Sequence, residues 1–185
     1  IPGDHKNFVG MVGMHGTTDG NYAIQNCDLL LAVGMRFDDR VTSDTSRFSQ
    51  HSKKIHVDID SSEIGKNVQV DIPIVGDAAE FFELLAGEVA DENADHSAWR
   101  QEIADHYRPL KHGDPDSLPP MELCDIINKE LDENTIVVTD VGQHQMWAAL
   151  FLHPKGPRHF LTSGGLGTIG YGLPAAIGAQ VGKKD

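Results

Sequence analysis

Short apolar runs that alternate with helix-like stretches are the feature that most constrains the fold of this chain. The runs at 28–34, 55–60 and 72–77 are short, and the last leads directly into residues 78–89, where apolar residues recur at helical spacing. Short runs between helical stretches are typical of strands in a largely buried parallel sheet. We therefore expect an α/β fold, with an open parallel sheet and flanking helices. Lys53 and Lys54, just before the run at 55–60, are expected to form a solvated strand entrance.

A polar stretch separates this part from a second one. Residues 93–118 are rich in His, Asp and Pro, and they contain one amphipathic helix near 98–108, which indicates an interdomain connector. We expect a central domain at 1–92 that lacks its amino-terminal part, and the truncated start of a second α/β domain at 119–185.

The same alternation resumes in the second part. We expect a helix from Pro120 to Leu131, a strand at 135–140 and a helix that starts near Met146. A strand at 160–162 and a helix of small residues at 173–181 follow.

Composition excludes several classes of function. The net charge is −13, from 15 Lys and Arg against 28 Asp and Glu, so the surface repels nucleic acid. No apolar run approaches the roughly 18 residues that span a bilayer. Cys27 and Cys124 lack CxxC spacing and are expected to be free thiols in a reducing, cytoplasmic setting. The ten histidines are scattered, and we assign no metal site.

Polar residues follow the expected strands of the first part, where parallel sheets bind ligands. Residues 36–41 contain two Arg and two Asp, which either pair with each other or bind phosphate and ribose. Asp58 is either a ribose partner or the cap of the next turn, and Asp77 either meets a nucleotide or caps a helix. Glycines at 12–17 allow close backbone approach, but a plain turn explains them better.

Two further glycine motifs occur in the second part. Residues 140–147 read as strand, glycine turn and helix, and a helix N-terminus with Gln143 and His144 suits a diphosphate; a capped turn with an interface histidine is equally open. Five glycines between 164 and 172 indicate a flat ligand against the backbone, with a tight helix-packing loop as the alternative.

Together these segments resemble one family, the biosynthetic acetolactate (acetohydroxyacid) synthases, of which the chain would be an internal piece of the catalytic subunit. The resemblance rests on GMHGT at 13–17, DLLL at 28–31, RFDDRV at 36–41, HVDID at 56–60, EIGKN at 63–67, GQHQMW at 142–147 and TSGGLG at 162–167.

The resemblance implies an enzyme that condenses pyruvate with a second 2-ketoacid and releases CO2, in branched-chain amino acid biosynthesis. It implies thiamine diphosphate, FAD and Mg²⁺ as cofactors, a Rossmann-like FAD-binding central domain, a homo-oligomer and a separate small regulatory subunit. The magnesium ligands are expected beyond Asp185, and the cofactor-activating Glu belongs to the missing front part. We therefore expect no catalytic residue and no turnover in these 185 residues alone.

The resemblance also assigns cofactor-binding residues, position by position. The FAD set is Val12, Gly13, Met14, His15, Gly34, Met35, Arg36, Phe37, Asp38, Arg40, Val41, Asp58, Ile59, Asp77 and Ala78, with Gly164 and Gly165 near the flavin. The thiamine diphosphate set is Gln143 and His144 at the diphosphate, with Gly167, Thr168 and Ile169 at the aminopyrimidine.

Three other functions remain open at this point. One is another thiamine diphosphate enzyme, either a glyoxylate carboligase or a pyruvate oxidase. The second is an FAD-free catabolic acetolactate synthase, although the block at 36–41 favours the FAD-containing type. The third belongs to a different class: a nucleotide-binding module without catalysis.

Overall fold

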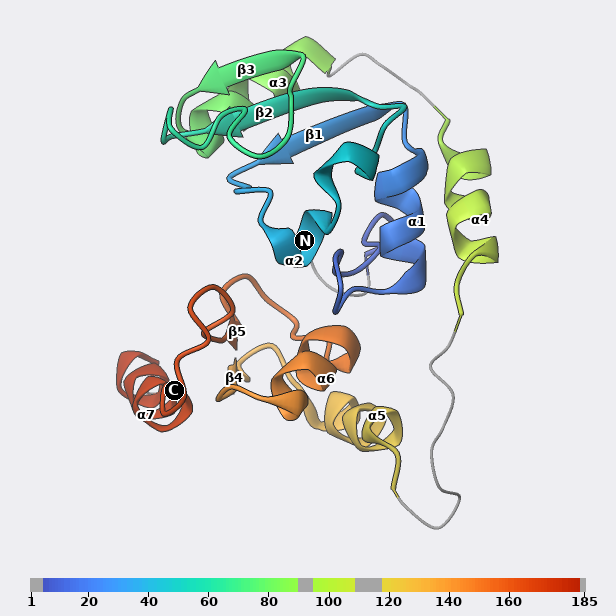
Figure 1. Ribbon diagram of the computed structural model, residues 1–185. Helices are drawn as coiled ribbons and strands as arrows, with labels where there is room; N and C mark the ends of the chain where they lie inside the picture. The colour runs from blue at the N-terminus through green and yellow to red at the C-terminus, as the bar shows by residue number, and fades with distance from the viewer. Residues whose placement is uncertain (1–4, 90–94, 109–117, 184–185) are drawn as a thin grey trace. The chain divides into compact units, whose positions relative to one another are not determined.

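The computed structural model describes residues 5–89, 95–108 and 118–183 (Figure 1). The chain divides into two compact units: Met11–Arg108, and Ile1–Gly10 with Pro109–Asp185. Each unit has its own small parallel sheet and its own helices. This confirms the predicted mixed α/β fold with parallel strands.

The sheet of the unit Met11–Arg108 is three-stranded, in the order β1 (Leu29–Val33), β2 (Lys53–Asp58), β3 (Ile72–Val75), and all its pairs are parallel. Val33 pairs with Val57, and Asp58 pairs with Val75. The three strands therefore end at nearly the same level, and the segments that follow them leave from one edge of the sheet.

Among the described residues of this unit, five helical elements accompany the sheet. They are α1 (Thr18–Asn26), α2 (Asp39–Thr42), the 3-10 helix η1 (Thr45–Arg47), α3 (Ala78–Val89) and α4 (Ser97–Asp105). Thr17 caps α1 by accepting a hydrogen bond from the Gly20 N–H at 3.0 Å. Tyr22 of α1 donates to the Glu102 carboxylate of α4 at 2.7 Å and stacks on the His106 ring at 3.5 Å. These contacts hold α1 and α4 side by side (Figure 1).

The core of this unit lies beside β1. Phe37 and Phe48 are each 2% exposed, and their rings meet edge to face at 5.8 Å. Ala32 and Val68 complete the buried cluster. Burying each phenylalanine contributes about 1.5–3 kcal/mol, so the segments after β1 are anchored by their aromatic residues.

Strand β2 begins two residues earlier than predicted, and one lysine expected in solvent is buried. Lys53 is exposed, but Lys54 is only 8% exposed, and its ammonium donates to the carbonyls of Ser49 at 2.7 Å and Ser52 at 3.2 Å. The prediction of a solvated strand entrance was therefore wrong for Lys54. The backbone of 49–52 satisfies the buried charge, which no local pattern reveals.

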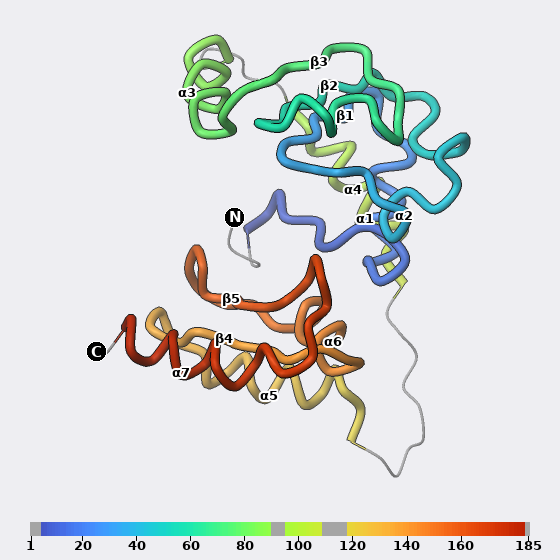
Figure 2. The backbone as a smooth tube through the Cα atoms, turned by 60° about the vertical axis from the view of Figure 1, so that its left-hand side comes forward, coloured from blue at the N-terminus to red at the C-terminus, as the bar shows by residue number. Residues whose placement is uncertain are grey.

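The second unit contains the parallel pair β4 (Val137–Val138) and β5 (Phe160–Leu161), with α5 (Pro120–Glu130), α6 (Gln143–Phe151) and α7 (Gly172–Gly182). Asn128 of α5 donates to the Phe151 carbonyl at 2.7 Å and accepts from the His153 N–H at 2.9 Å, which ties α5 to α6. In Figure 1, α7 lies on one side of the strand pair, and α5 and α6 lie on the other. Figure 2 traces the same elements as a tube from another angle.

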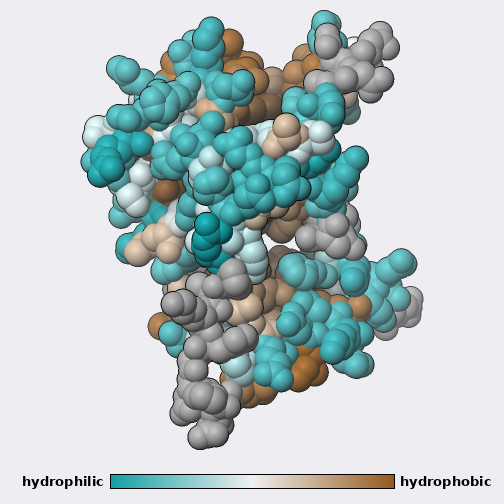
Figure 3. Space-filling view, turned by 90° about the vertical axis from the view of Figure 1, so that its right-hand side faces the viewer, coloured by the Kyte–Doolittle hydropathy of each residue, from teal (hydrophilic) through white to brown (hydrophobic). Residues whose placement is uncertain are grey.

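Hydrophilic residues cover most of the face drawn in Figure 3, with hydrophobic patches among them. In the part of the chain that the structure describes, no helix is both long and apolar enough to cross a membrane.

The predicted connector divides between the two units. Helix α4 lies inside the range 93–118 and packs on α1 within the unit Met11–Arg108. The boundary expected near 92 falls within residues 90–94, which lie outside the described residues. The boundary expected near 118 falls where the description resumes after residues 109–117. The domain boundaries stay a prediction.

Candidate functional site

The loop at 12–15 is held against the segment that follows β1. The Met14 N–H donates to the Arg40 carbonyl at 2.8 Å. Asn21 fixes Gly13 from the other side, through bonds of 2.8 Å to its N–H and 2.9 Å to its carbonyl. The structure therefore brings together two predicted groups, Val12–His15 and Arg40–Val41, that are more than twenty residues apart.

Backbone packing explains the glycine at position 13. Gly13 has φ +100, and a Cβ there would lie 2.5 Å from the Arg40 carbonyl oxygen. The glycine therefore allows a close approach of two backbone segments, and the choice between a plain turn and a ligand site at 12–17 stays a prediction. Met14 is 57% exposed, and its sulfur lies 3.5 Å from an Arg40 guanidinium nitrogen.

Arg36 and Asp38 form an ion pair of 2.9 Å after β1, as one of the two sequence interpretations proposed. The Arg36 side chain is 61% exposed, so most of its guanidinium N–H groups still face solvent. The second Asp38 oxygen, Oδ1, is buried and has no partner within the described residues. The pair thus leaves donors and one acceptor unused at the strand end.

Phe37 points away from the surface of this segment. Its ring is 2% exposed and meets the His56 ring at 4.9 Å. Its φ of 50° turns the chain so that the flanking Arg36 and Asp38 stay outside while the ring enters the core. Only the backbone of Phe37 is therefore available to a ligand.

The acidic residues at the carboxyl ends of β2 and β3 both have local partners. Asp58 is 9% exposed and accepts from the Asp60 N–H at 2.9 Å. Asp77 accepts from the Ala79 and Glu80 N–H groups at 2.8 and 3.2 Å and so caps α3, which begins at Ala78. Ile59, between the two aspartates of the β2 end, is 75% exposed.

In the second unit, α6 begins at Gln143, not near Met146 as predicted. Gly142 occupies the N-cap at φ 142, where a glycine is favoured, and it offers no capping side chain. Its carbonyl accepts from the N–H groups of Gln145 and Met146. The Gln143 and His144 N–H groups have no partner in the described residues, so the start of α6 presents free donors.

The glycine-rich loop lies next to this turn. The Ser163 side chain accepts from the Thr168 N–H at 3.0 Å, and Gln145 of α6 donates to Thr162 at 2.7 Å. Gly167 has a φ of 65°, and a Cβ added to it would lie 3.9 Å from a Val141 methyl carbon. The predicted residues Gln143, His144, Gly164, Gly165, Gly167, Thr168 and Ile169 are all exposed and lie on these two adjacent segments.

Asp140 was not predicted as a site residue. Its carboxylate accepts from the N–H groups of Val141 at 2.8 Å, Gly170 at 3.0 Å and Gly172 at 2.8 Å. These backbone hydrogen bonds, that of Val141 first, lower the pKa of Asp140 from its ordinary value. An acidic residue at the carboxyl end of a strand is the same signal that singled out Asp58, and it could have been used here.

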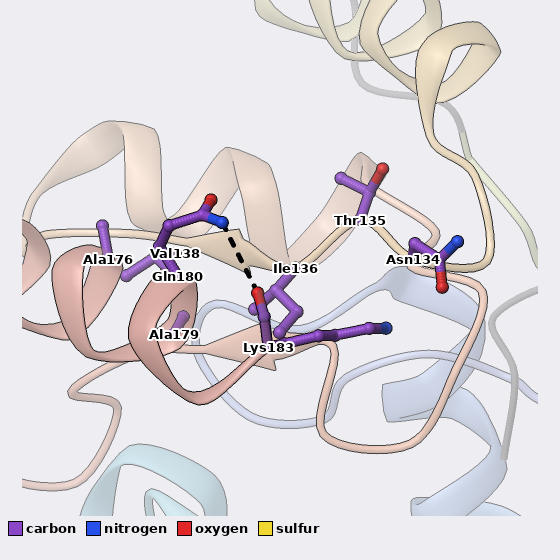
Figure 4. A pocket seen from close by; sticks show the side chains of 8 residues that line it. All are labelled: Asn134, Thr135, Ile136, Val138, Ala176, Ala179, Gln180 and Lys183. Atoms are coloured by element: carbon purple, nitrogen blue, oxygen red, sulfur yellow. Dashed lines mark hydrogen bonds between the residues drawn. The ribbon is translucent and has the colours of Figure 1, made fainter. Parts of the chain in front are cut away.

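The cavity shown in Figure 4 lies elsewhere in this unit. It measures about 550 Å³ and is lined by Asn134, Thr135, Ile136 and Val138 and, from α7 and its end, by Ala176, Ala179, Gln180 and Lys183. Asn134 and Thr135 precede β4, whereas ligands of parallel sheets bind beyond the carboxyl ends of strands. The cavity is therefore separate from the glycine motifs.

Metal and thiol chemistry find no assembled site in the described ranges. No group of three His, Cys, Asp or Glu side chains there could hold a metal ion. Cys27 and Cys124 are both free thiols, as expected. Burial, and then the charge of Asp125, raise the pKa of Cys124, which makes it less reactive.

Comparison with known proteins identifies the class to which this arrangement belongs. Residues 1–85 match the family "Thiamine pyrophosphate enzyme, central domain", and residues 140–185 match "Thiamine pyrophosphate enzyme, C-terminal TPP binding domain". The chain therefore belongs to the thiamine pyrophosphate enzyme family.

Within that family, the chain is similar over its whole length to acetolactate synthase large subunits. The probable large subunit of Methanocaldococcus jannaschii is 50% identical, over 99% of this chain and 33% of that protein. That of Corynebacterium glutamicum is 46% identical, over 100% and 31%. Chloroplastic acetolactate synthase 1 of Nicotiana tabacum is 45% identical, over 100% and 29%. These matches confirm the predicted resemblance, and the chain spans about a third of the length of these relatives.

Proposed function

We propose that this chain is part of an acetolactate synthase, which condenses pyruvate with a second 2-ketoacid and releases CO2. The observation that carries the proposal is the similarity to acetolactate synthase large subunits along the entire chain. The proposal includes FAD and Mg²⁺ as cofactors, ketoacids as substrates, a homo-oligomer, a small regulatory subunit and a cytoplasmic location. Catalysis by these 185 residues alone is not expected.

The residues at the start of α6 fit a diphosphate. The free N–H groups of Gln143 and His144 lie at the positive end of a helix, where anions are stabilised. The exposed glycine loop beside them, at 164–167, lets a flat ring approach the backbone closely. Thiamine diphosphate, when bound, supplies carbanion stabilisation. The chain's own contribution here is to bind its diphosphate and orient its ring.

The strand ends of the unit Met11–Arg108 fit a dinucleotide such as FAD. The Arg36 guanidinium keeps exposed donors for phosphate, and the buried Asp38 Oδ1 lacks a partner within the described residues. Both follow β1, next to the loop at 12–15. We propose that this edge forms a Rossmann-like FAD site. The Mg²⁺ ligands are proposed to lie outside the described residues.

Cofactor titration tests these assignments. FAD binding to the full-length protein is followed by flavin fluorescence, with Arg36→Ala as the test variant and Arg47→Ala, an exposed arginine of η1, as its control. We expect Arg36→Ala to weaken FAD binding on the order of 10-fold, because a charge-assisted hydrogen bond is lost. Equal affinities for both variants and the wild type would remove Arg36 from the site.

Product analysis tests the reaction. The full-length protein with thiamine diphosphate, FAD and Mg²⁺ is expected to form acetolactate from pyruvate while the flavin stays oxidised. Flavin reduction during turnover would instead indicate a pyruvate oxidase, and carboligation of glyoxylate without acetolactate would indicate a glyoxylate carboligase. Turnover without bound flavin would indicate the FAD-free catabolic type. Cofactor binding without any turnover would favour a non-catalytic nucleotide-binding module.

A further inference from the structure

One carboxylate joins three backbone segments around the proposed thiamine diphosphate site. Asp140 lies two residues after the end of β4. Its oxygens accept from Val141 in the turn before α6, from Gly170 in the glycine-rich loop and from Gly172 at the first residue of α7. Gly170 and Gly172 are 30 and 32 residues away in the sequence. The carboxylate therefore connects the two segments that hold the predicted thiamine diphosphate residues.

This contact also decides which helix start is free. The residue before α7, Tyr171, provides no side-chain cap, and the Gly172 N–H is instead capped by Asp140 at 2.8 Å. The N-terminus of α7 thus already has an anionic partner from within the protein. At α6, Gly142 provides no cap, and the first two N–H groups lack partners within the described residues.

We propose that Asp140 is a positioning residue that docks the glycine-rich loop and the start of α7 against the β4–α6 turn, so that only α6 receives the diphosphate. This inference rests on the proposed function, because it concerns the same cofactor. Asp140 itself does not contact the cofactor. Its carboxylate acts through the backbone of Val141, Gly170 and Gly172.

Gly172 is also required for this contact. A Cβ on Gly172 would lie 2.9 Å from the Asp140 backbone nitrogen and 3.0 Å from its Cβ. Contacts of that length force something to move, so an alanine would push the start of α7 off the carboxylate while leaving the charge in place. Gly172→Ala and Asp140→Asn therefore break one contact from its two sides.

The test compares Asp140→Asn with Asp132→Asn in the full-length protein. Asp132 is the matched control, because its carboxylate accepts from Asn134 and Thr135 within one local turn. An asparagine amide cannot accept all three N–H groups that Asp140 binds. We expect amide hydrogen exchange at Gly170 and Gly172 to rise at least about 10-fold in Asp140→Asn and to stay at the wild-type rate in Asp132→Asn.

Thiamine diphosphate binding gives the second readout. We expect its Kd, and its apparent KM in turnover, to rise on the order of 10-fold in Asp140→Asn, while kcat at saturating cofactor stays near the wild-type value. A merely structural carboxylate would lower kcat through the amount of folded protein and leave the Kd unchanged. Faster exchange with an unchanged Kd would therefore overturn the positioning role, and so would unchanged exchange.

A double variant keeps the proposal falsifiable if Asp140→Asn folds poorly. Gly172→Ala alone should raise the same exchange rates and the Kd, and adding Asp140→Asn should give less than the product of the two single effects, because both break one contact. A fully multiplicative effect would overturn the proposal. If the wild type does not bind thiamine diphosphate, the proposed function fails, and unchanged exchange at Gly170 and Gly172 would still separately overturn the docking by Asp140.

Discussion

The structural roles of some residues in this chain cannot be predicted from residue type alone. Gly13 is required because the Arg40 carbonyl lies where its side chain would be. Lys54 is a charged residue inside the protein, held by two carbonyl groups of the preceding turn. In both cases the neighbour that fixes the residue comes from the backbone of another segment or turn.

Gly13→Ala should destabilise the protein more than Gly65→Ala. Both glycines have positive φ, but a Cβ meets the Arg40 carbonyl oxygen at 2.5 Å only at position 13, whereas nothing lies within 4 Å at position 65. Positive φ alone costs about 1 kcal/mol, and the clash should bring the loss at Gly13 to roughly 2–4 kcal/mol. Urea unfolding of the two variants measures the difference, and equal losses would contradict the packing argument.

Lys54→Met should lower the free energy of unfolding by about 1–3 kcal/mol, because the Ser49 and Ser52 carbonyls lose their donor in a buried place. Lys53→Met is the control, because Lys53 precedes Lys54 on the same strand and is exposed. Its substitution should change the free energy of unfolding by less than about 0.5 kcal/mol. Thermal unfolding of both variants provides the measurement. A stabilised Lys54→Met protein would show that desolvating the ammonium costs more free energy than its two hydrogen bonds contribute.

At the scale of elements, helix starts organise both units. Helix α3 is capped by the aspartate that immediately precedes it, as the sequence predicted. Helix α7 is capped by Asp140, which lies just beyond the end of β4 on another segment. The first arrangement follows from neighbouring residues in the chain, and the second exists only when β4 and the glycine-rich loop come together.

Asp77→Ala should cost about 1 kcal/mol of stability, because two N–H groups at the start of α3 lose their acceptor. Asp77→Ser keeps a capping oxygen and should retain most of that stability. Chemical denaturation of the two variants distinguishes capping from charge. If Asp77→Ser binds FAD more weakly than wild type at unchanged stability, Asp77 also serves the cofactor.

Asp140 should make the start of α7 sensitive to acid. Its backbone hydrogen bonds lower its pKa below the ordinary value of 3.8, so the carboxylate form stabilises the folded state above that value. The contribution is lost as pH falls below 3.8 and through the lowered pKa. The difference in unfolding midpoint between wild type and Asp140→Asn should therefore be constant from pH 7 to 5 and shrink in more acidic buffer. A difference that grows on acidification would contradict this assignment.

For the whole molecule, the two units divide the proposed cofactors between them. The unit Met11–Arg108 carries the strand ends assigned to FAD, and the unit with β4 and β5 carries the segments assigned to thiamine diphosphate. Ligands that bind the folded state protect the segments they touch.

Hydrogen exchange of the full-length protein should accordingly show two separate patterns. FAD should slow exchange at 12–15 and 34–41, and thiamine diphosphate should slow it at 141–145 and 163–170. Each is measured by mass spectrometry with one cofactor at a time, and the helix α5 segment serves as a region that neither should protect. Protection of 34–41 by thiamine diphosphate alone would contradict the division.

Local patterns in the sequence determined the element types and most of their positions. Apolar runs placed β1 and β3 within one or two residues, because a buried strand needs consecutive apolar residues bounded by turns. Asp77 and Pro120 marked the starts of α3 and α5, since capping and the fixed φ of proline act within a few residues. The motifs at 36–41 and 142–147 likewise identified the family.

Tertiary structure alone decided which of those residues meet. The inward turn of Phe37, the burial of Lys54 and the bonds from Asp140 to Gly170 and Gly172 all depend on segments that are distant in the chain or on the backbone path between them. A polar side chain or a backbone N–H can be satisfied by many partners, so spacing along the sequence does not select one. Folding selects it, because the parallel register of each sheet fixes which strand ends lie together.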